Sequence, residues 1–267
     1  MTTITYRAGA TVFRDRGLER RFREEGYVVA PLLDDHGIGS FGALLGELGP
    51  APGDPGIGLF NDSWSTDPDY KRRLCEGIDA LLQPGIDRLV EGYRPLISAT
   101  SKKWPGPEGE VVAHRDPTFV DETEFRSLGV WCALRETTTA DGTLRVLPGS
   151  HRLDTEVRVH QAPSNLYPEA DRDGRLVDVP LPAGHAILYD HTLIHGSAPN
   201  TGHHPRTVLM TMLVPTTAST FYAVRTSDST ATVFSADTDF YLSQRLNCLD
   251  LETLRRDHHA IYSFPFP

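Results

Sequence analysis

The first third of the chain is predicted to be mainly helical. Residues 18–25 have the spacing of a short amphipathic helix, and a strand interrupted by Pro31 follows at residues 27–31. Helical spacing returns over residues 41–48 and, more strongly, from Pro68 to about Gly92. The apolar positions that share one helical face in that last segment are Leu74, Ile78, Leu81 and Leu82.

After Pro95 the pattern changes to short β-rich runs separated by turn residues. Several such runs without helical patterns between them predict an antiparallel sandwich or barrel rather than a parallel sheet with crossover helices. The polar, poorly periodic segment 154–175 is interpreted as an insertion or lid, and one helix is predicted over residues 238–256. The predicted strands cover residues 97–103, 128–134, 143–147, 176–179, 185–189 and 206–214.

Length alone leaves the number of domains open, because 267 residues correspond to roughly two average domains or to one large β-sandwich or barrel. The chain has no repeat, low-complexity tract or linker-like composition, which favours one decorated domain. We therefore expect a single domain over residues 1–267, with a β-rich core at about 95–215. A helical N-terminal part at 14–92 and a C-terminal cap at 216–267 would flank this core.

Composition excludes several function classes. The net charge of −10, from 26 basic and 36 acidic residues, argues against a general nucleic-acid or anionic-membrane binder. Three cysteines without a close pair predict neither a disulfide framework nor a cysteine zinc site. The chain also lacks a signal-peptide pattern and any run of roughly 18 apolar residues. We expect a soluble, cytoplasmic protein without nucleic-acid or membrane partners.

One glycine pattern is typical of dinucleotide sites. Residues 37–42 read G-x-G-x-x-G between a strand-like and a helix-like run, where glycines can admit a pyrophosphate. Against this interpretation, Asp34 and Asp35 would repel a diphosphate, and a Gly/Pro-rich stretch at 49–53 stands where a second parallel strand should begin. A simple glycine-rich turn is favoured, and a dinucleotide-dependent oxidoreductase is the less favoured alternative.

Histidine is the more promising source of chemistry, with eleven residues in the chain. In His114-x-Asp116, residues i and i+2 of an extended segment point to the same side, so an imidazole and a carboxylate can meet one metal ion. His195 ends a strand-like run 81 positions after His114 and is the best candidate for a third ligand. Two histidines and a carboxylate with open positions form the facial triad of non-haem Fe(II) oxygenases.

Such a site leaves positions open for an α-keto acid and dioxygen. The far carboxylate of the keto acid then needs a cation, and the guanidinium of Arg206, eleven positions after His195, is suited to bidentate carboxylate binding. Ser197 could add a hydroxyl hydrogen bond to the same carboxylate. The residues alone therefore suggest an oxygenase that uses a keto-acid co-substrate.

Five motifs occur in the order and spacing of the phytanoyl-CoA dioxygenase family of Fe(II)/2-oxoglutarate-dependent oxygenases, which the chain closely resembles. The resemblance covers residues 97–215, with a weaker match at 25–29, and implies a mainly β fold. That fold has a double-stranded β-helix (jelly-roll, cupin-like) core with flanking N-terminal and C-terminal helices. The motifs are H-R-D at 114–116, W-C-A-L at 131–134, D-G-T-L-R-V-L-P-G-S-H at 141–151, G-H-A-I-L-Y-D at 184–190, and H-G-S at 195–197 with Arg206.

The resemblance also implies a cofactor and its ligands. Fe(II) would be held by His114, Asp116 and His195, with 2-oxoglutarate as co-substrate and O2 as oxidant. Related halogenases have glycine or alanine at the position of Asp116, which opens a site for halide. The carboxylate in this chain therefore argues for oxygenation.

The co-substrate would meet a second group of residues. Arg206 and Ser197 match the family's carboxylate ligands, and Trp131 matches the aromatic wall beside them, although Trp131 fits an ordinary sandwich core equally well. One further polar side chain is expected from one face of the strand before the H-R-D motif, and we select Thr100 for this role. The candidates on that face are Ser98, Thr100 and Lys102.

The other histidines have simpler interpretations. His151, in the P-G-S-H turn, is predicted to make structural hydrogen bonds, whereas His185 and His191 fit a ligand role less well than His195. Residues 203–204 are assigned to a solvated turn, and no role is assigned to the histidines at 258–259. Asp190 is predicted to be a structural acid, because another carboxylate would compete with an anionic co-substrate.

The sequence therefore predicts an Fe(II)- and 2-oxoglutarate-dependent dioxygenase. It would oxidise a C–H bond of a small organic metabolite, in the manner of a hydroxylase, and convert 2-oxoglutarate to succinate. Desaturation, epoxidation and ring closure are alternative outcomes of the same chemistry, and the substrate is suggested to be an intermediate of specialised metabolism. Substrate contacts are expected from residues 117–126, from 154–175 and from the segment after Pro215. The alternative from another class is a non-oxidative cupin-type metalloenzyme, which would not need Arg206.

Overall fold

Two antiparallel sheets form the centre of the structure, a computed structural model that describes residues 11–153, 155–160, 165–244 and 251–265. The larger sheet contains, in spatial order, β1 (Tyr27–Pro31), β8 (His185–Asp190), β5 (Leu128–Ala133), β10 (Arg206–Pro215), β3 (Tyr93–Lys103) and β2 (Leu59–Asn61). The smaller sheet contains β4 (Val111–His114), β9 (His195–Ser197), β6 (Leu144–Val146) and β7 (Val177–Asp178). This mainly β arrangement confirms the predicted jelly-roll class.

The larger sheet is buried on both of its faces, and its strands show why. All six residues of β5 are buried, although successive side chains point to opposite faces. Val130 and Cys132 pack into the core beneath the helices, whereas Trp131 and Ala133 join a second core that includes Val146 of the smaller sheet. The functional groups described below lie on this second face.

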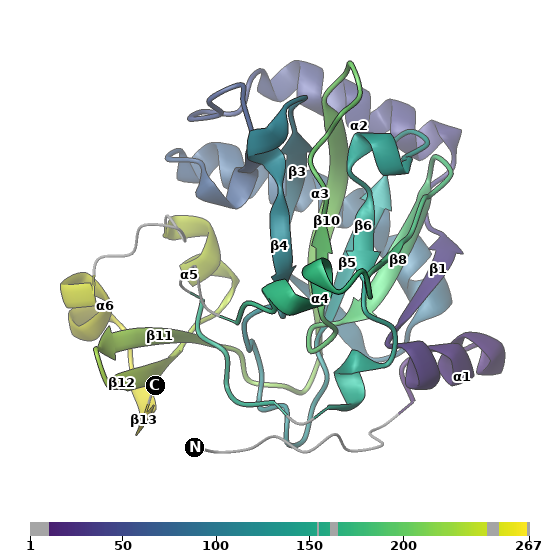
Figure 1. Ribbon diagram of the computed structural model, residues 1–267. Helices are drawn as coiled ribbons and strands as arrows, with labels where there is room; N and C mark the ends of the chain where they lie inside the picture. Colours follow the sequence, from purple (N-terminus) through teal and green to yellow (C-terminus); the bar gives the residue numbers. More distant parts are fainter. Residues whose placement is uncertain (1–10, 154, 161–164, 245–250, 266–267) are drawn as a thin grey trace.

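Helices α1 (Arg16–Glu25), α2 (Asp35–Leu48) and α3 (Pro68–Leu89) account for the predicted helical N-terminal part. Helix α3 starts where the Asp67 side chain accepts hydrogen bonds from the Asp69 and Tyr70 amides, with Pro68 in its first turn. Its apolar stripe packs on the outer face of the larger sheet, and Figure 1 shows α2 and α3 behind that sheet. The helices thus leave the opposite face for the smaller sheet.

The glycine pattern at 37–42 lies inside helix α2, so the prediction of a glycine-rich turn there is wrong. The Asp34 side chain accepts the Gly37 amide at 2.8 Å and caps the helix, and the Ile38 amide bonds to the Asp34 carbonyl at 3.0 Å. Strand β1, which precedes the helix, pairs antiparallel with β8. A dinucleotide site needs a parallel strand–loop–helix unit, so the dinucleotide alternative is not supported.

The region after Pro215 contains strands that its mixed pattern did not reveal. Strands β11 (Phe221–Ser227), β12 (Thr230–Ser235) and β13 (Ala260–Pro265) form a separate antiparallel sheet, which Figure 1 shows beside α5 (Thr238–Ser243) and α6 (Leu251–Asp257). The single helix predicted over 238–256 is wrong, because the backbone becomes extended at Gln244. Residues 245–250 of that prediction lie outside the described residues.

Described residues of the segment 154–175 pack against the rest of the structure. This segment contains α4 (Pro168–Arg172), and Val159 is buried against Phe221 of β11. Residues 154 and 161–164 of this predicted insertion lie outside the described residues. Short 3-10 helices occur at η1 (Asp62–Trp64), η2 (Pro107–Gly109), η3 (Thr139–Asp141) and η4 (Ser150–Arg152). None of the described helices is both long and apolar enough to cross a membrane.

We predict that Gly129→Ala destabilises the protein by about 1–3 kcal/mol, the usual cost of overpacking a core. Gly129 pairs with Tyr189 across β5 and β8, and a Cβ atom at Gly129 would overlap the tyrosine ring. Tyr189 is 1% exposed and lies against His195, so the ring has little room to move. The measurement is the free energy of unfolding from urea titration.

The matched control is Gly42→Ala in the middle of helix α2, where a Cβ atom would meet nothing within 4 Å. Because glycine is a poorer helix former than alanine, this variant should gain about 0.5–1 kcal/mol. Unchanged stability in Gly129→Ala, or a loss in Gly42→Ala, would contradict the packing described here.

Candidate active site

The smaller sheet brings together two histidines that are far apart in the sequence. His114 is the last residue of β4 and His195 the first of β9, and the two residues are direct partners in the antiparallel register. Their ring centroids lie 4.4 Å apart. Because opposed residues of paired strands present their side chains to the same face, the register alone places both rings together.

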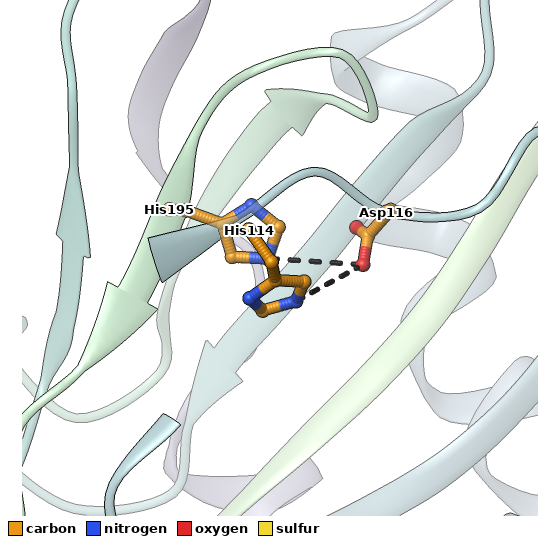
Figure 2. Close-up of side chains that lie close together, drawn as sticks. All are labelled: His114, Asp116 and His195. Carbon is orange, nitrogen blue, oxygen red and sulfur yellow. Dashed lines mark ion pairs between the residues drawn. The ribbon is translucent and has the colours of Figure 1, made fainter. Parts of the chain in front are cut away.

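Asp116 reaches the same place by a different route from the one predicted. Strand β4 ends at His114, so Asp116 does not belong to a continuous extended strand with it. Instead its amide donates to the His191 carbonyl at 3.1 Å, just before the turn that leads to His195. The carboxylate Oδ1 lies 3.7 Å from Nε2 of His114 and 3.7 Å from Nε2 of His195, as Figure 2 shows.

Backbone carbonyls orient the two rings for metal binding. Nδ1 of His114 lies 2.9 Å from the Val112 carbonyl, and Nδ1 of His195 lies 3.0 Å from the Leu193 carbonyl. A carbonyl can only accept, so both Nδ1 atoms carry the proton and donate. In the neutral form of each ring the lone pair is then on Nε2, the atom that faces Asp116.

The charge states also suit a cation. Burial would raise the pKa of Asp116, but the neighbouring His195, His114 and His191 rings hold it well below its usual range. Burial lowers the pKa of His195 to about 4, so this ring is neutral at pH 7. Among the described residues, one ligand atom each from His114, Asp116 and His195 fall within 4.8 Å of one another, and the buried Oδ2 of Asp116 has no hydrogen-bond partner. Two imidazoles and an unsatisfied carboxylate fit a non-haem iron ion.

Tyr189 adds a contact that the sequence analysis missed. Its ring centroid lies 4.7 Å from that of His195, and burial together with the Asp116 carboxylate raises the pKa of its hydroxyl well above the ordinary value. The phenol therefore remains a proton donor beside a metal-ligand candidate. The sequence gives only a weak signal for this contact. Gly129 leaves room for the Tyr189 ring, but this is visible only once the pairing of β5 with β8 is known.

Two buried basic side chains lie side by side at the other end of the same face. Arg206 and Lys103 are direct partners across β10 and β3, and they are 2% and 0% exposed. The Arg206 guanidinium lies 4.9 Å from the Trp131 ring centroid and donates to the Gly142 carbonyl. Lys103 Nζ donates to the Ser197 Oγ at 2.5 Å. Arg206, Ser197 and Trp131 thus lie together, as the sequence predicted.

No carboxylate among the described residues forms an ion pair with either cation, and Nε of Arg206 has no hydrogen-bond partner there. Burial and the nearby Arg206 and Arg145 charges lower the pKa of Lys103 to about 6. The Glu110 carboxylate acts in the opposite direction and raises this pKa. Burial lowers the pKa of Arg206 to about 9. Two buried basic groups without an acidic partner are costly to charge, and an anion beside them would favour their charged forms, so this part of the face is suited to a ligand carboxylate.

The predicted role of Thr100 in co-substrate binding is wrong, and strand parity explains the error. Thr100 faces the helices, where its hydroxyl and amide donate to the Asp62 carboxylate. Residues of alternate parity on β3, which include Lys103, face the smaller sheet instead. The other two candidates on the Thr100 face are also occupied: Ser98 donates to Asp79, and Lys102 pairs with Asp54 at 3.0 Å.

The remaining acid and histidines have the contacts expected of structural residues. His151 bonds to the Arg23 carbonyl, and Asp190 pairs with Arg126 at 2.7 Å. His191 is fully buried and its Nε2 lies 3.9 Å from Asp116, but its Nδ1 bonds to the Ser127 hydroxyl at 2.7 Å. His191 therefore lies beside Asp116 as a structural residue and is not one of the three ligand candidates.

A family model described as phytanoyl-CoA dioxygenase (PhyH) matches residues 60–208, which is over half of the chain. The chain belongs to this family. The matched span includes all three metal-ligand candidates and Arg206, and the resemblance read from the motifs is confirmed.

Known relatives share part of the sequence and the core. The phytanoyl-CoA dioxygenase domain-containing protein 1 of Danio rerio is 36% identical over 134 residues, which cover 46% of this chain and 46% of the relative. The chain therefore spans about half the length of the curated relatives it matches.

Two solved structures show the same fold at lower identity. The carbocyclase SnoK from nogalamycin biosynthesis superposes with a TM-score of 0.56 and 21% identity, covering 77% of this chain and 86% of SnoK. HygX from Streptomyces hygroscopicus gives a TM-score of 0.53 and 18% identity over 76% of this chain and 88% of HygX. The HygX structure holds nickel, 2-oxoglutarate and hygromycin B.

The pKa of Lys103 predicts proton uptake when a dianion such as 2-oxoglutarate binds. At pH 7.5 the free amine, with its pKa of about 6, is mostly neutral, and an adjacent carboxylate favours the charged form. Affinity should therefore weaken as pH rises above about 6, by up to about tenfold per pH unit until the pKa of the bound state is reached. Calorimetry of the Ni(II)-loaded protein in buffers with different ionisation enthalpies measures the uptake.

The control for this prediction is Lys102→Met, which removes the adjacent lysine on the opposite face of β3 and should leave the proton uptake intact. Lys103→Met should abolish it. Equal uptake by Lys103→Met and the wild type would show that another group takes up the proton.

Proposed function

We propose that this protein is an Fe(II)- and 2-oxoglutarate-dependent oxygenase of the hydroxylase type. The observation that carries the proposal is the pairing of two features on one face of the fold. One is the metal-ligand set of His114, Asp116 and His195, and the other is the buried cation pair of Lys103 and Arg206. Family membership supports the same reaction class.

His114, Asp116 and His195 would hold the iron, which when bound activates dioxygen and drives the oxidative decarboxylation of the keto acid to succinate. The protein would supply the Nε2 atoms of two imidazoles and one ionised carboxylate oxygen. The carbonyls of Val112 and Leu193 keep the ring protons on Nδ1 and away from the iron. These contacts position the ligands before any metal binds.

Lys103, Arg206 and Ser197 would bind the far carboxylate of 2-oxoglutarate. His195 and Ser197 are alternate residues of β9, so their side chains point to one face and lie about 6–7 Å apart along the strand. That separation suits a five-carbon dicarboxylate with its keto-acid end at the metal and its other end at Ser197. Trp131 would cover the methylene groups from the side.

The other groups near the ligands would exclude water and limit proton transfer. Tyr189 and His191 are 1% and 0% exposed, and burial lowers the pKa of His191 to about 4. A neutral histidine and a phenol of raised pKa neither release nor take up protons at pH 7. Tyr189 and His191 would thus keep their charge constant while one C–H bond of the substrate is oxidised.

We propose a small organic metabolite as the substrate, with hydroxylation as the outcome. Solved structures of the same fold support the size class, because they include the nogalamycin carbocyclase SnoK and HygX with hygromycin B. The ionised Asp116 occupies the position that a halide would need, which favours oxygenation over halogenation. A non-oxidative cupin-type enzyme would have no use for two buried cations without counterions.

The test measures 2-oxoglutarate turnover without substrate. Under air with Fe(II), the wild type should release succinate, and the anaerobic complex with iron and 2-oxoglutarate should show a metal-to-ligand charge-transfer band. In His195→Ala both signals should fall at least about 100-fold, because even residues behind the ligands typically contribute 10–100-fold to metal affinity. Absence of both signals from the wild type would refute the proposal.

Arg206→Met separates the co-substrate from the metal. Loss of a charge-assisted hydrogen bond to the carboxylate, worth roughly 1.5–3 kcal/mol, should raise the KM for 2-oxoglutarate by about 10–150-fold. Iron affinity measured without 2-oxoglutarate should stay at the wild-type value. An Arg206→Met variant with an unchanged KM would show that Arg206 does not bind the co-substrate carboxylate.

A further inference from the structure

A buried ion pair joins two loops beside the metal-ligand set. Arg158, in the segment after β6, and Glu122, in the loop after Asp116, have side chains that are 3% and 5% exposed. The guanidinium and carboxylate meet in a two-pronged arrangement, with Nη1 to Oε2 at 2.9 Å and Nη2 to Oε1 at 2.5 Å. Bidentate pairs of this kind hold both groups in one orientation.

The third donor of the guanidinium contacts Asp116 directly. Nε of Arg158 donates to the Asp116 main-chain carbonyl at 2.6 Å. The Arg158 backbone bonds to Thr118 in both directions, since its amide donates to the Thr118 hydroxyl at 3.0 Å and its carbonyl accepts the Thr118 amide at 3.1 Å. Arg158 thus contacts Asp116 and Thr118 through its guanidinium, its amide and its carbonyl.

Asp116 needs such support because it lies beyond the end of β4. The paired strands β4 and β9 position both histidines, but among the described residues the Asp116 backbone has only the His191 carbonyl on its amide and the Arg158 guanidinium on its carbonyl. Nothing in the strand register determines where the carboxylate points. Its rotation would change the distance to both Nε2 atoms at once.

We propose that the Arg158–Glu122 pair is a positioning device that holds Asp116 in metal-binding geometry. The proposal rests on the proposed metal centre and deepens it by naming the residues that preset its single carboxylate ligand. Glu122 orients the guanidinium, and Arg158 fixes the Asp116 peptide. Neither side chain belongs to the metal-ligand candidates.

Co(II) binding to the metal-free protein tests the proposal, because its visible ligand-field bands report both affinity and coordination geometry. Arg158→Lys keeps the positive charge but loses the fork and the Nε donor. It should weaken Co(II) binding by about 10–100-fold, as expected for an outer partner of a metal ligand, and shift the bands. The double variant Arg158→Met with Glu122→Leu should do the same, without leaving a buried charge unpaired.

The matched control is Arg23→Lys. Arg23 and Glu19 form a similarly short ion pair, at 2.6 Å, four residues apart in α1. This variant makes the same chemical change and should leave both Co(II) affinity and band positions at the wild-type values. Urea unfolding of each metal-free variant measures the structural effect separately, and the double variant provides a folded protein if Arg158→Lys is too unstable.

The outcomes separate the two proposals. Wild-type Co(II) affinity and spectrum in a folded Arg158→Lys or double variant would overturn the positioning role and leave the proposed function intact. Failure of the wild type itself to bind Co(II) would overturn the metal centre and the positioning role together. Weaker binding in the Arg158 variants with shifted bands, and unchanged binding in Arg23→Lys, supports the inference.

Discussion

The pairing of β4 with β9 is the constraint on which the site depends. It places His114 opposite His195 although 80 residues separate them, and their carbonyl partners select the ring tautomers in the same step. The strand register also sets the rest of the face, because Ser197 follows His195 by one strand period and meets Lys103 of the larger sheet. The two histidine ligand candidates and the Lys103–Arg206 pair are therefore positioned by one short stretch of sheet. The exception is Asp116, whose position comes from loop contacts, and this explains why the surrounding loops carry an interlocked network of charged residues.

The charges around this face fall into two kinds. Arg158 and Glu122 satisfy one another inside the protein, as do Arg126 and Asp190. Arg206 and Lys103 have no such partner among the described residues. Buried pairs add little net stability, so the first kind is best understood through the geometry that it holds. The second kind is unfavourable in the free protein, and an anionic ligand would relieve it. Charged groups that are paired within the protein, such as Arg158 and Glu122, thus have a structural role. Basic groups without an acidic partner, Arg206 and Lys103, are suited to binding an anionic ligand.

Much of the fold could be predicted from the sequence, because periodicity reports which residues are buried. The runs at 97–103, 128–134 and 206–214 became the central strands β3, β5 and β10, in which most residues are buried although β3 is largely polar. Prediction failed where a shift of one residue matters. The alternation of side chains along β3 was predicted correctly, but the sequence does not say whether the even-numbered or the odd-numbered residues face the smaller sheet. Thr100 was selected, and Lys103 lies in the site. The glycines at 37–42 failed for a related reason, because a strong cap at Asp34 makes a helix of residues whose individual preferences favour a turn.

The unsatisfied groups also bear on stability. Nε of Arg206 and Oδ2 of Asp116 are buried without hydrogen-bond partners among the described residues, and each such group carries a desolvation penalty of roughly 1–3 kcal/mol or more. These penalties apply to the native state alone, since both atoms are hydrated in the unfolded chain. A cation at Asp116 and a carboxylate at Arg206 would remove these desolvation penalties. Because both ligands bind only the native state, their binding would increase the free energy of unfolding. In the free protein, the packing of the two sheets and the contacts of Arg158 must therefore offset these penalties. The site requires these rigid surroundings.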